Sequence, residues 1–92
     1  MTASGSRQSA GVTRPPTSTT SAALATGGGR GTRYVFNDSA GKLYVLFGTG
    51  TASATNFSLL IPTQTGQVIE GFGGALQGIL DTGTGSAQIT EW

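Results

Sequence analysis

The side chains that could perform acid–base or nucleophilic chemistry are few in this sequence. It contains no histidine and no cysteine, and it has only four carboxylates and one lysine, Lys42. Serine and threonine are abundant, but a hydroxyl nucleophile needs an adjacent base, and Lys42 lies where a predicted turn meets a predicted strand. Asp38 and Asp81 lie in predicted turns, where aspartate commonly accepts local hydrogen bonds. Because neither a base nor a group to orient it can be named, we predict no catalytic residues and no enzymatic activity.

Metal and cofactor chemistry is not indicated either. The sequence offers no thiolate or imidazole ligand, and its carboxylates are too scattered for a calcium loop. Two glycine-rich segments, Gly48-Thr49-Gly50 and Gly71-Phe72-Gly73-Gly74, precede neither a predicted helix nor a Lys-Ser/Thr pair, so we interpret them as turns rather than phosphate-binding loops. We therefore predict no metal and no cofactor.

The arginines are concentrated at one end of the chain. Residues 1–33 hold four arginines and no acidic residue, a formal charge of +4, whereas residues 34–92 hold one lysine and four acids, a charge of −3. This asymmetry favours docking of the basic segment on an acidic surface, because a guanidinium makes two parallel hydrogen bonds to a carboxylate. We predict that four residues bind a partner in this way: Arg7, Arg14, Arg30 and Arg33.

Residues 1–32 have the composition of an irregular chain. They are rich in glycine, serine and threonine, and their large apolar residues are Met1, Val12 and Leu24. Such a segment buries too little apolar surface to offset the entropy of ordering it. We predict a flexible basic arm over residues 1–32, in which 21–25 is compatible with one helical turn, and a folded domain over residues 33–92.

After Arg33, short apolar runs alternate with turn residues, a pattern typical of β-strands. The expected strands are 34–36, 42–47, 56–61, 67–72, 75–80 and 86–92. Their spacing predicts an all-β fold, a small antiparallel sandwich or barrel, preceded by the extended, largely irregular N-terminal arm. Gly78 inside the strand 75–80 indicates a bulge or a close backbone approach.

Alternating positions within these strands predict the core. In the last strand, Ala87 and Ile89 face inward. Since both faces of the strand 42–47 are largely apolar, we expect it to be central and covered on both sides. Six residues of the second and third strands are expected to be buried: Leu43, Val45, Phe47, Phe57, Leu59 and Ile61.

The size of the folded part favours assembly. The range 34–92 contains 59 residues, and a domain of that size buries only about 60% of its unfolded surface. With no disulfide and no metal, oligomerisation or docking on a larger partner is the remaining common source of stability. We therefore expect a homo-oligomer or a complex with other proteins. The longest apolar stretch, 43–47, is far too short to span a membrane, and residues 1–24 have no apolar run of the kind found in signal peptides.

Nucleic-acid binding is the alternative of another class. Gly27-Gly28-Gly29-Arg30-Gly31 resembles a fragment of an Arg/Gly segment, which would bind nucleic acid electrostatically beside a β-module. The folded part is net negative, however, and its aromatic residues alternate with aliphatic rather than basic ones, so it lacks a basic footprint. We rank this reading below protein–protein assembly.

The order of short motifs in the folded part resembles small structural proteins of tailed bacteriophages, including capsid decoration (cement) proteins. The resemblance covers residues 33–91. Its motifs are Asn37-Asp38-Ser39, Lys42-Leu43-Tyr44-Val45, Gly48, Ser53, Asn56-Phe57-Ser58, Gln77-Gly78-Ile79 and Gly85-Ser86-Ala87-Gln88-Ile89-Thr90-Glu91.

The resemblance implies a non-catalytic virion protein that bridges neighbouring capsid subunits. Its expected partners are the major capsid protein or other virion proteins, and its expected location is the virion, after synthesis in the host cytoplasm. A head–tail or tail component of the virion is the alternative within the same class. Extended arms that cross neighbouring subunits are common among such proteins, which agrees with the predicted arm.

Overall fold

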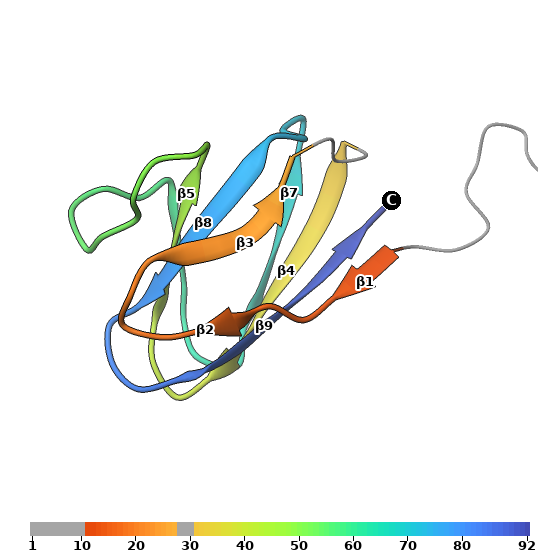
Figure 1. The fold of residues 1–92 in the computed structure, drawn as a ribbon. Helices are drawn as coiled ribbons and strands as arrows, with labels where there is room; N and C mark the ends of the chain where they lie inside the picture. The colour runs from red at the N-terminus through yellow and green to blue at the C-terminus, as the bar shows by residue number, and fades with distance from the viewer. Residues whose placement is uncertain (1–10, 28–30) are drawn as a thin grey trace, which may run out of the picture.

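The computed structural model describes residues 11–27 and 31–92, and every regular element in them is a β-strand (Figure 1). The strands form two antiparallel sheets that face each other across one hydrophobic core. The predicted all-β antiparallel fold is therefore confirmed. In these residues, no helix is long and apolar enough to cross a membrane.

Sheet A has the strand order β1-β9-β4-β7. β2 pairs with the same edge of β9 as β1 does, at the other end of that strand. β9 pairs with three other strands of this sheet, with β4 along one edge and with both β1 and β2 along the other. The strands of sheet A are β1 (Gly11–Thr13), β2 (Pro16–Thr17), β4 (Thr32–Ser39), β7 (Gly66–Glu70) and β9 (Gly85–Glu91).

Sheet B has the order β3-β8-β5-β6. Its two inner strands, β8 and β5, pair directly, so the predicted central position of the strand near 42–47 is confirmed. The strands of sheet B are β3 (Ala22–Thr26), β5 (Leu43–Phe47), β6 (Leu59–Ile61) and β8 (Ala75–Leu80). The chain passes from β2 in sheet A to β3 in sheet B, which brings the β1 and β3 edges to one side of the sandwich (Figure 1).

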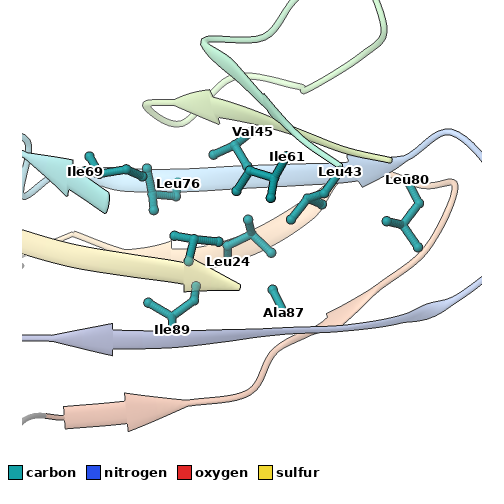
Figure 2. Packing of buried hydrophobic residues seen from close by; sticks show 10 residues of the cluster. Leu24, Leu43, Val45, Ile61, Ile69, Leu76, Leu80, Ala87 and Ile89 are labelled. Atoms are coloured by element: carbon teal, nitrogen blue, oxygen red, sulfur yellow. The ribbon is translucent and has the colours of Figure 1, made fainter. Parts of the chain in front are cut away.

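The core lies between the sheets and is built by side chains from both of them (Figure 2). Alternation along the strands explains its membership, because every second residue of a strand points to the same face. The predicted inward positions Leu43, Val45, Ala87 and Ile89 are fully buried. The complete cluster comprises Leu24, Val35, Leu43, Val45, Ile61, Ile69, Leu76, Leu80, Ala87 and Ile89.

A buried polar network closes one end of the sandwich. The Asn37 side chain, which is fully buried, donates from Nδ2 to the carbonyl oxygens of Gly41 (2.8 Å) and Ile61 (3.0 Å). Its Oδ1 accepts a hydrogen bond from Ser39 Oγ at 2.6 Å. Because both ends of the amide have partners, Asn37 joins β4 to the chain beside β5 and β6 without leaving a buried polar atom unsatisfied.

The predicted irregular arm differs from the structure over residues 11–26. This range contributes β1 and β2 to sheet A and β3 to sheet B, and residues 22–25 of the possible helical turn at 21–25 lie in β3 instead. The composition concealed these strands because their inward-facing residues are mostly small. One large residue, Leu24, is 4% exposed and lies in the core. No break occurs at the predicted boundary after residue 32, since β4 begins at Thr32. Residues 1–10 and 28–30 of the predicted arm lie outside the described range.

The third predicted strand is shorter than expected. It begins at Leu59 rather than at 56, and Phe57 is 40% exposed, so its predicted burial is wrong. Asn56 is held in the preceding loop instead, where its Nδ2 donates to Thr51 O at 2.9 Å and its backbone pairs with Ser53. Phe47 and Leu59 are partly buried at the border of the core.

Candidate interaction surfaces

Arg33 is a structural residue in the interior, not an exposed partner-binding residue. It lies on the inward side of β4 and has no exposed surface. Its Nε donates to Glu91 Oε2 at 2.6 Å, and its Nη1 donates to Gly74 O at 2.6 Å. Longer hydrogen bonds reach the carbonyl oxygens of Phe72 and Gly73. Four hydrogen bonds thus hold the guanidinium within the chain, contrary to the prediction that Arg33 binds a partner.

This arrangement explains why a charge is tolerated in the interior. A buried guanidinium is costly unless a carboxylate and further hydrogen bonds replace its water. Glu91 supplies the negative charge from β9, and the loop after β7 supplies the carbonyl oxygens. The same loop places Phe72 against Phe47, with stacked rings whose centroids are 4.9 Å apart. Arg33 therefore fixes the loop between β7 and β8 against sheet A.

Arg14 is exposed, but it too has partners within the chain. It follows β1 and makes an ion pair with Asp38 on β4, and its Nη1 donates to Gln88 Oε1 on β9 at 2.9 Å. The hydrogen bond from Arg14, together with one from Gln64, holds the pKa of the Asp38 carboxyl below its ordinary value, against a smaller opposing effect of desolvation. Arg14 thus fastens the N-terminal strands across the outer face of sheet A.

The four predicted partner-binding arginines are not brought together by the described structure. Arg33 and Arg14 lie on opposite faces of sheet A, one buried and one exposed. Arg7 and Arg30 lie outside the described residues. A single basic patch is therefore not formed by the two arginines that can be placed.

Sheet B contains no charged residue in any of its strands. The sequences of β3, β5, β6 and β8 are AALAT, LYVLF, LLI and ALQGIL. By contrast, the β4, β7 and β9 strands of sheet A each carry at least one charged residue. Surfaces without charge are unusual on a soluble monomer and are typical of the central part of protein interfaces.

The outer face of sheet B carries an aromatic and aliphatic cluster. Its centre is Tyr44, which is paired across the sheet with Leu60 on β6 and with Ile79 on β8. Phe57 comes from the loop before β6 and meets Tyr44 edge to face, with ring centroids 5.0 Å apart. Leu60 is 41% exposed, so a large apolar side chain faces solvent there. We call Tyr44, Phe57, Leu60 and Ile79 the sheet B patch.

The loop between β5 and β6 covers another part of the same face. Ala52 in this loop is almost fully buried, and its backbone N–H donates to Ser21 Oγ at 2.9 Å, just before β3. The predicted covering of the strand 42–47 on both sides is thus only partly realised. The same loop contributes Phe57 to the sheet B patch, so it covers part of this face and extends the apolar surface on another part.

A second apolar feature crosses the outer face of sheet A. Register places Val12, Thr90, Tyr34 and Val68 opposite one another on β1, β9, β4 and β7. Val12 and Val68 are 58% and 46% exposed, and they lie at the two edges of the sheet. The Arg14–Asp38 ion pair lies on the same face of sheet A, farther along β4.

An open groove of about 410 Å³ lies where the β1 and β3 edges approach each other. Leu24 and Ala25 provide its apolar lining, and Arg14 and Glu91 its charged groups. Both charged groups already have partners, in Asp38 and Arg33. The groove therefore offers a ligand no uncompensated charge. Nor do the described residues contain a group of three His, Cys, Asp or Glu side chains that could hold a metal ion.

The sheet B patch could not be found from the sequence alone. Its residues come from β5, β6, β8 and a loop, and β7 of sheet A separates β6 from β8 along the chain. Two features of the sequence pointed to this surface: the apolar outer face of the strand 42–47 and the motif Asn56-Phe57-Ser58. Only the pairing of Leu60 and Ile79 with Tyr44 makes them one surface.

Comparison of the chain with protein-family models, with curated proteins and with solved structures finds no match.

Proposed function

We propose that this chain is a non-enzymatic structural subunit that decorates a bacteriophage capsid and bridges neighbouring capsid subunits in the virion. The observation that supports the proposal most strongly is the uncharged sheet B with the exposed sheet B patch. The sequence resemblance to bacteriophage structural proteins suggests that the partner is a capsid. The sheet B patch suggests how the chain attaches to that partner. In this proposal the sheet B patch binds the major capsid protein or another virion protein.

The chemistry of the sheet B patch suits a protein partner. Tyrosine and phenylalanine supply large, rigid contact areas, and aromatic residues are enriched where interfaces are energetically strongest. Polar residues border this patch at one end, where the Asp81 carboxylate accepts a hydrogen bond from the Lys42 backbone N–H at 2.8 Å. An apolar centre with a polar border is the usual anatomy of a protein interface.

A head–tail or tail component of the virion would use the same surface. The two possibilities differ in where the partner lies, not in how the chain would bind it. Imaging of the particle therefore separates them, whereas mutation of the sheet B patch does not.

A nucleic-acid-binding module receives less support. Binding to phosphates needs exposed lysine and arginine side chains that are free to displace counterions. Arg33 is buried and Arg14 is paired with Asp38, so among the described residues Lys42 is the remaining cation. Sheet B, which would have to provide a stacking platform, has no basic residue in its strands.

The proposal is tested by locating the chain in virions produced from a genome that encodes it. We expect the density that is lost when this gene is deleted to lie on the outer capsid, between neighbouring subunits. Loss of density at the tail or at the head–tail junction would support the alternative component. Virions that are unchanged by the deletion and do not contain the chain would contradict both readings.

A pair of variants tests whether the sheet B patch carries attachment. Leu60→Asp places a charge in this patch, and Val12→Asp places the same charge at a still more exposed valine on sheet A. We expect Leu60→Asp to reduce occupancy on particles that lack the chain, and Val12→Asp to leave it unchanged. Equal occupancy of the two variants would show that the sheet B patch is not the attachment surface.

A salt titration distinguishes the nucleic-acid alternative. Binding to phosphates releases the counterions that were condensed on the nucleic acid. The entropy gained by this release falls as salt is raised, so such binding weakens steeply. We expect the free chain to show no salt-sensitive binding to a single-stranded or double-stranded oligonucleotide. Tight binding that falls with salt would favour the nucleic-acid module over the capsid proposal.

A further inference from the structure

The edge strands of the sandwich are not equally protected against pairing with another strand. Natural sheets guard their edges with short strands, bulges, prolines or charges. β1 has three residues and is followed by Pro15-Pro16, β6 has three residues and is followed by Pro62, and β3 contains a bulge between Ala23 and Ala25. β7 is different, because its five residues pair with β4 in unbroken register and include no proline.

Hydrogen bonds on either side of β7 establish which of its backbone groups face β4. Asn37 N donates to Thr65 O at 2.9 Å before the strand, and Gly71 N donates to Gly31 O at 3.0 Å after it. Hydrogen-bonded pairs alternate with non-bonded pairs along an antiparallel ladder. The residues of β7 whose N–H and C=O groups point to β4 are therefore Gln67 and Ile69.

The backbone groups of the other three residues, Gly66, Val68 and Glu70, point away from β4. Within the described part of the chain, the hydrogen bond on this side is made by Gln67 Nε2, which donates to Val68 O at 3.2 Å. Gln67 is an exposed residue with a flexible side chain, so its amide can leave without disturbing the sheet. The edge of β7 thus presents a row of donors and acceptors suited to another strand.

We propose that β7 pairs antiparallel with β7 of a second copy of this chain, about a two-fold axis at Val68. In this register Val68 lies opposite Val68 of the second copy, and their N–H and C=O groups bond reciprocally. Gly66 of each chain lies opposite Glu70 of the other, and these residues complete the ladder. Every backbone group that faces the free edge of β7 then has a partner.

The side chains on the outer face of sheet A are compatible with this register. The two glutamates lie at opposite ends of the paired strands, so no like charges are opposed, which would destabilise a cross-strand pair. Each Glu70 faces a glycine. The Tyr34 hydroxyl lies over that glycine and fills the space that a Cβ at position 66 would need. Glu70 of the second copy can accept a hydrogen bond from this hydroxyl, which would be a charge-assisted bond.

The apolar row on sheet A also becomes continuous in such a pair. Val68 ends the row at the β7 edge, next to Tyr34, and both side chains are more than one third exposed. Two copies would place the row of one chain beside the row of the other. Self-complementarity of backbone, charge and apolar side chains is why we infer a second copy rather than a strand of another protein.

This inference does not depend on the capsid proposal, because it concerns the free chain in solution and a different sheet. The test is the concentration dependence of the mass of the full chain in sedimentation equilibrium. Wild-type protein should be in monomer–dimer equilibrium. Val68→Lys would place two positive charges opposite each other at the two-fold axis. It should therefore raise the dimer dissociation constant by about tenfold or more. Val12→Lys, the same change at the other end of the row, should leave that constant unchanged.

A cross-linking experiment does not rely on the lysine variants folding normally. The sequence has no cysteine, so Val68→Cys and Val12→Cys each introduce a single thiol. Directly bonded antiparallel partners have Cα atoms about 5.5 Å apart, a distance that a disulfide can bridge. Mild oxidation should convert Val68→Cys to a covalent dimer much faster than Val12→Cys. A monomeric wild type at its highest soluble concentration, equal dissociation constants for the lysine variants, or equal cross-linking of the two cysteine variants would each overturn the proposal.

Discussion

Leu24 occupies the space above Gly78 in which any larger residue would have its side chain. A Cβ at position 78 would lie 2.7 Å from Leu24 Cδ1. The two residues belong to the neighbouring strands β3 and β8, and Leu24 sits at the bulge where the β3 register shifts. The predicted bulge does not lie at Gly78, which is regularly paired with Ala22 and Val45. The bulge lies in the partner strand, and a side chain rather than a backbone approaches Gly78 closely. Through Leu24, the N-terminal segment forms part of the core.

Deletion of residues 1–26 should abolish cooperative folding. It removes β1, β2 and β3, and the loss of a core leucine alone costs about 2–5 kcal/mol, a large share of the stability of a small domain. Thermal unfolding followed by circular dichroism measures the effect. Deletion of residues 1–10 is the control, since it removes none of the described strands. A sharp unfolding transition in the longer deletion would show that β3 is dispensable.

Arg33→Met should destabilise the protein far more than Arg14→Met. Removing one partner of a buried ion pair costs about 3–5 kcal/mol, because Glu91 and several carbonyl groups lose their partner. The exposed Arg14–Asp38 pair contributes little, because solvent and salt screen the attraction between exposed charges. Urea unfolding of both variants gives the two free energies. Similar losses would mean that the Arg33 cluster is not the anchor of the loop between β7 and β8.

Leu43→Ala and Leu60→Ala should separate folding from association. Leu43 is fully buried, so its truncation should lower the free energy of unfolding by about 2–5 kcal/mol. Leu60 is 41% exposed on the sheet B patch, and its truncation should change stability little. Urea unfolding of the free protein checks both values. A large loss of stability for Leu60→Ala would indicate that this residue belongs to the core instead.

Asp38 should add stability that disappears in acid. Its pKa in the folded state lies below the ordinary value of 3.8, mainly because Arg14 donates a hydrogen bond to its carboxylate. A carboxylate with a lowered folded pKa stabilises the protein at pH values above the unfolded pKa and loses this effect as pH falls through the folded pKa.

The variant Asp38→Asn isolates this contribution. Wild type should be more stable than Asp38→Asn at neutral pH, and the difference should shrink as the pH is lowered below 3.8 and through the folded pKa. Melting temperatures across this range measure the difference. A gap between the two proteins that stays constant down to the lowest pH would exclude ionisation of Asp38 as its cause.

The strands that the sequence predicted well are those whose alternation is carried by large residues. The strand 75–80 was predicted with the bounds it has, and Ala87 and Ile89 were correctly placed inward. β3 was missed because its residues are alanine and threonine except for Leu24, so the apolar alternation is weak. Proline, glycine and serine around it have the composition of a linker as readily as that of a strand.

The role of Arg33 could not be predicted because its partners are distant in sequence. Glu91 is 58 positions away, and the carbonyl groups come from a glycine-rich loop whose function depends on backbone position rather than residue type. Arg33 lies three residues after Arg30, so the sequence suggested that it belongs to the basic segment. Arg33 instead lies on the inward side of β4. It is two residues from Val35, so its side chain points toward the core as that of Val35 does.

The pairing of β9 with β1, β2 and β4 has a consequence for biosynthesis. β9 is the last strand along the described chain, and β8, which holds β3 in place, comes just before it. As the polypeptide leaves the ribosome, β1, β2 and β3 emerge long before their partner strands exist, so sheet A cannot close until β9 has emerged. Pairings between such distant segments slow folding. In the meantime the uncharged strands of sheet B remain exposed, a state in which nascent chains are prone to aggregate and are protected by chaperones.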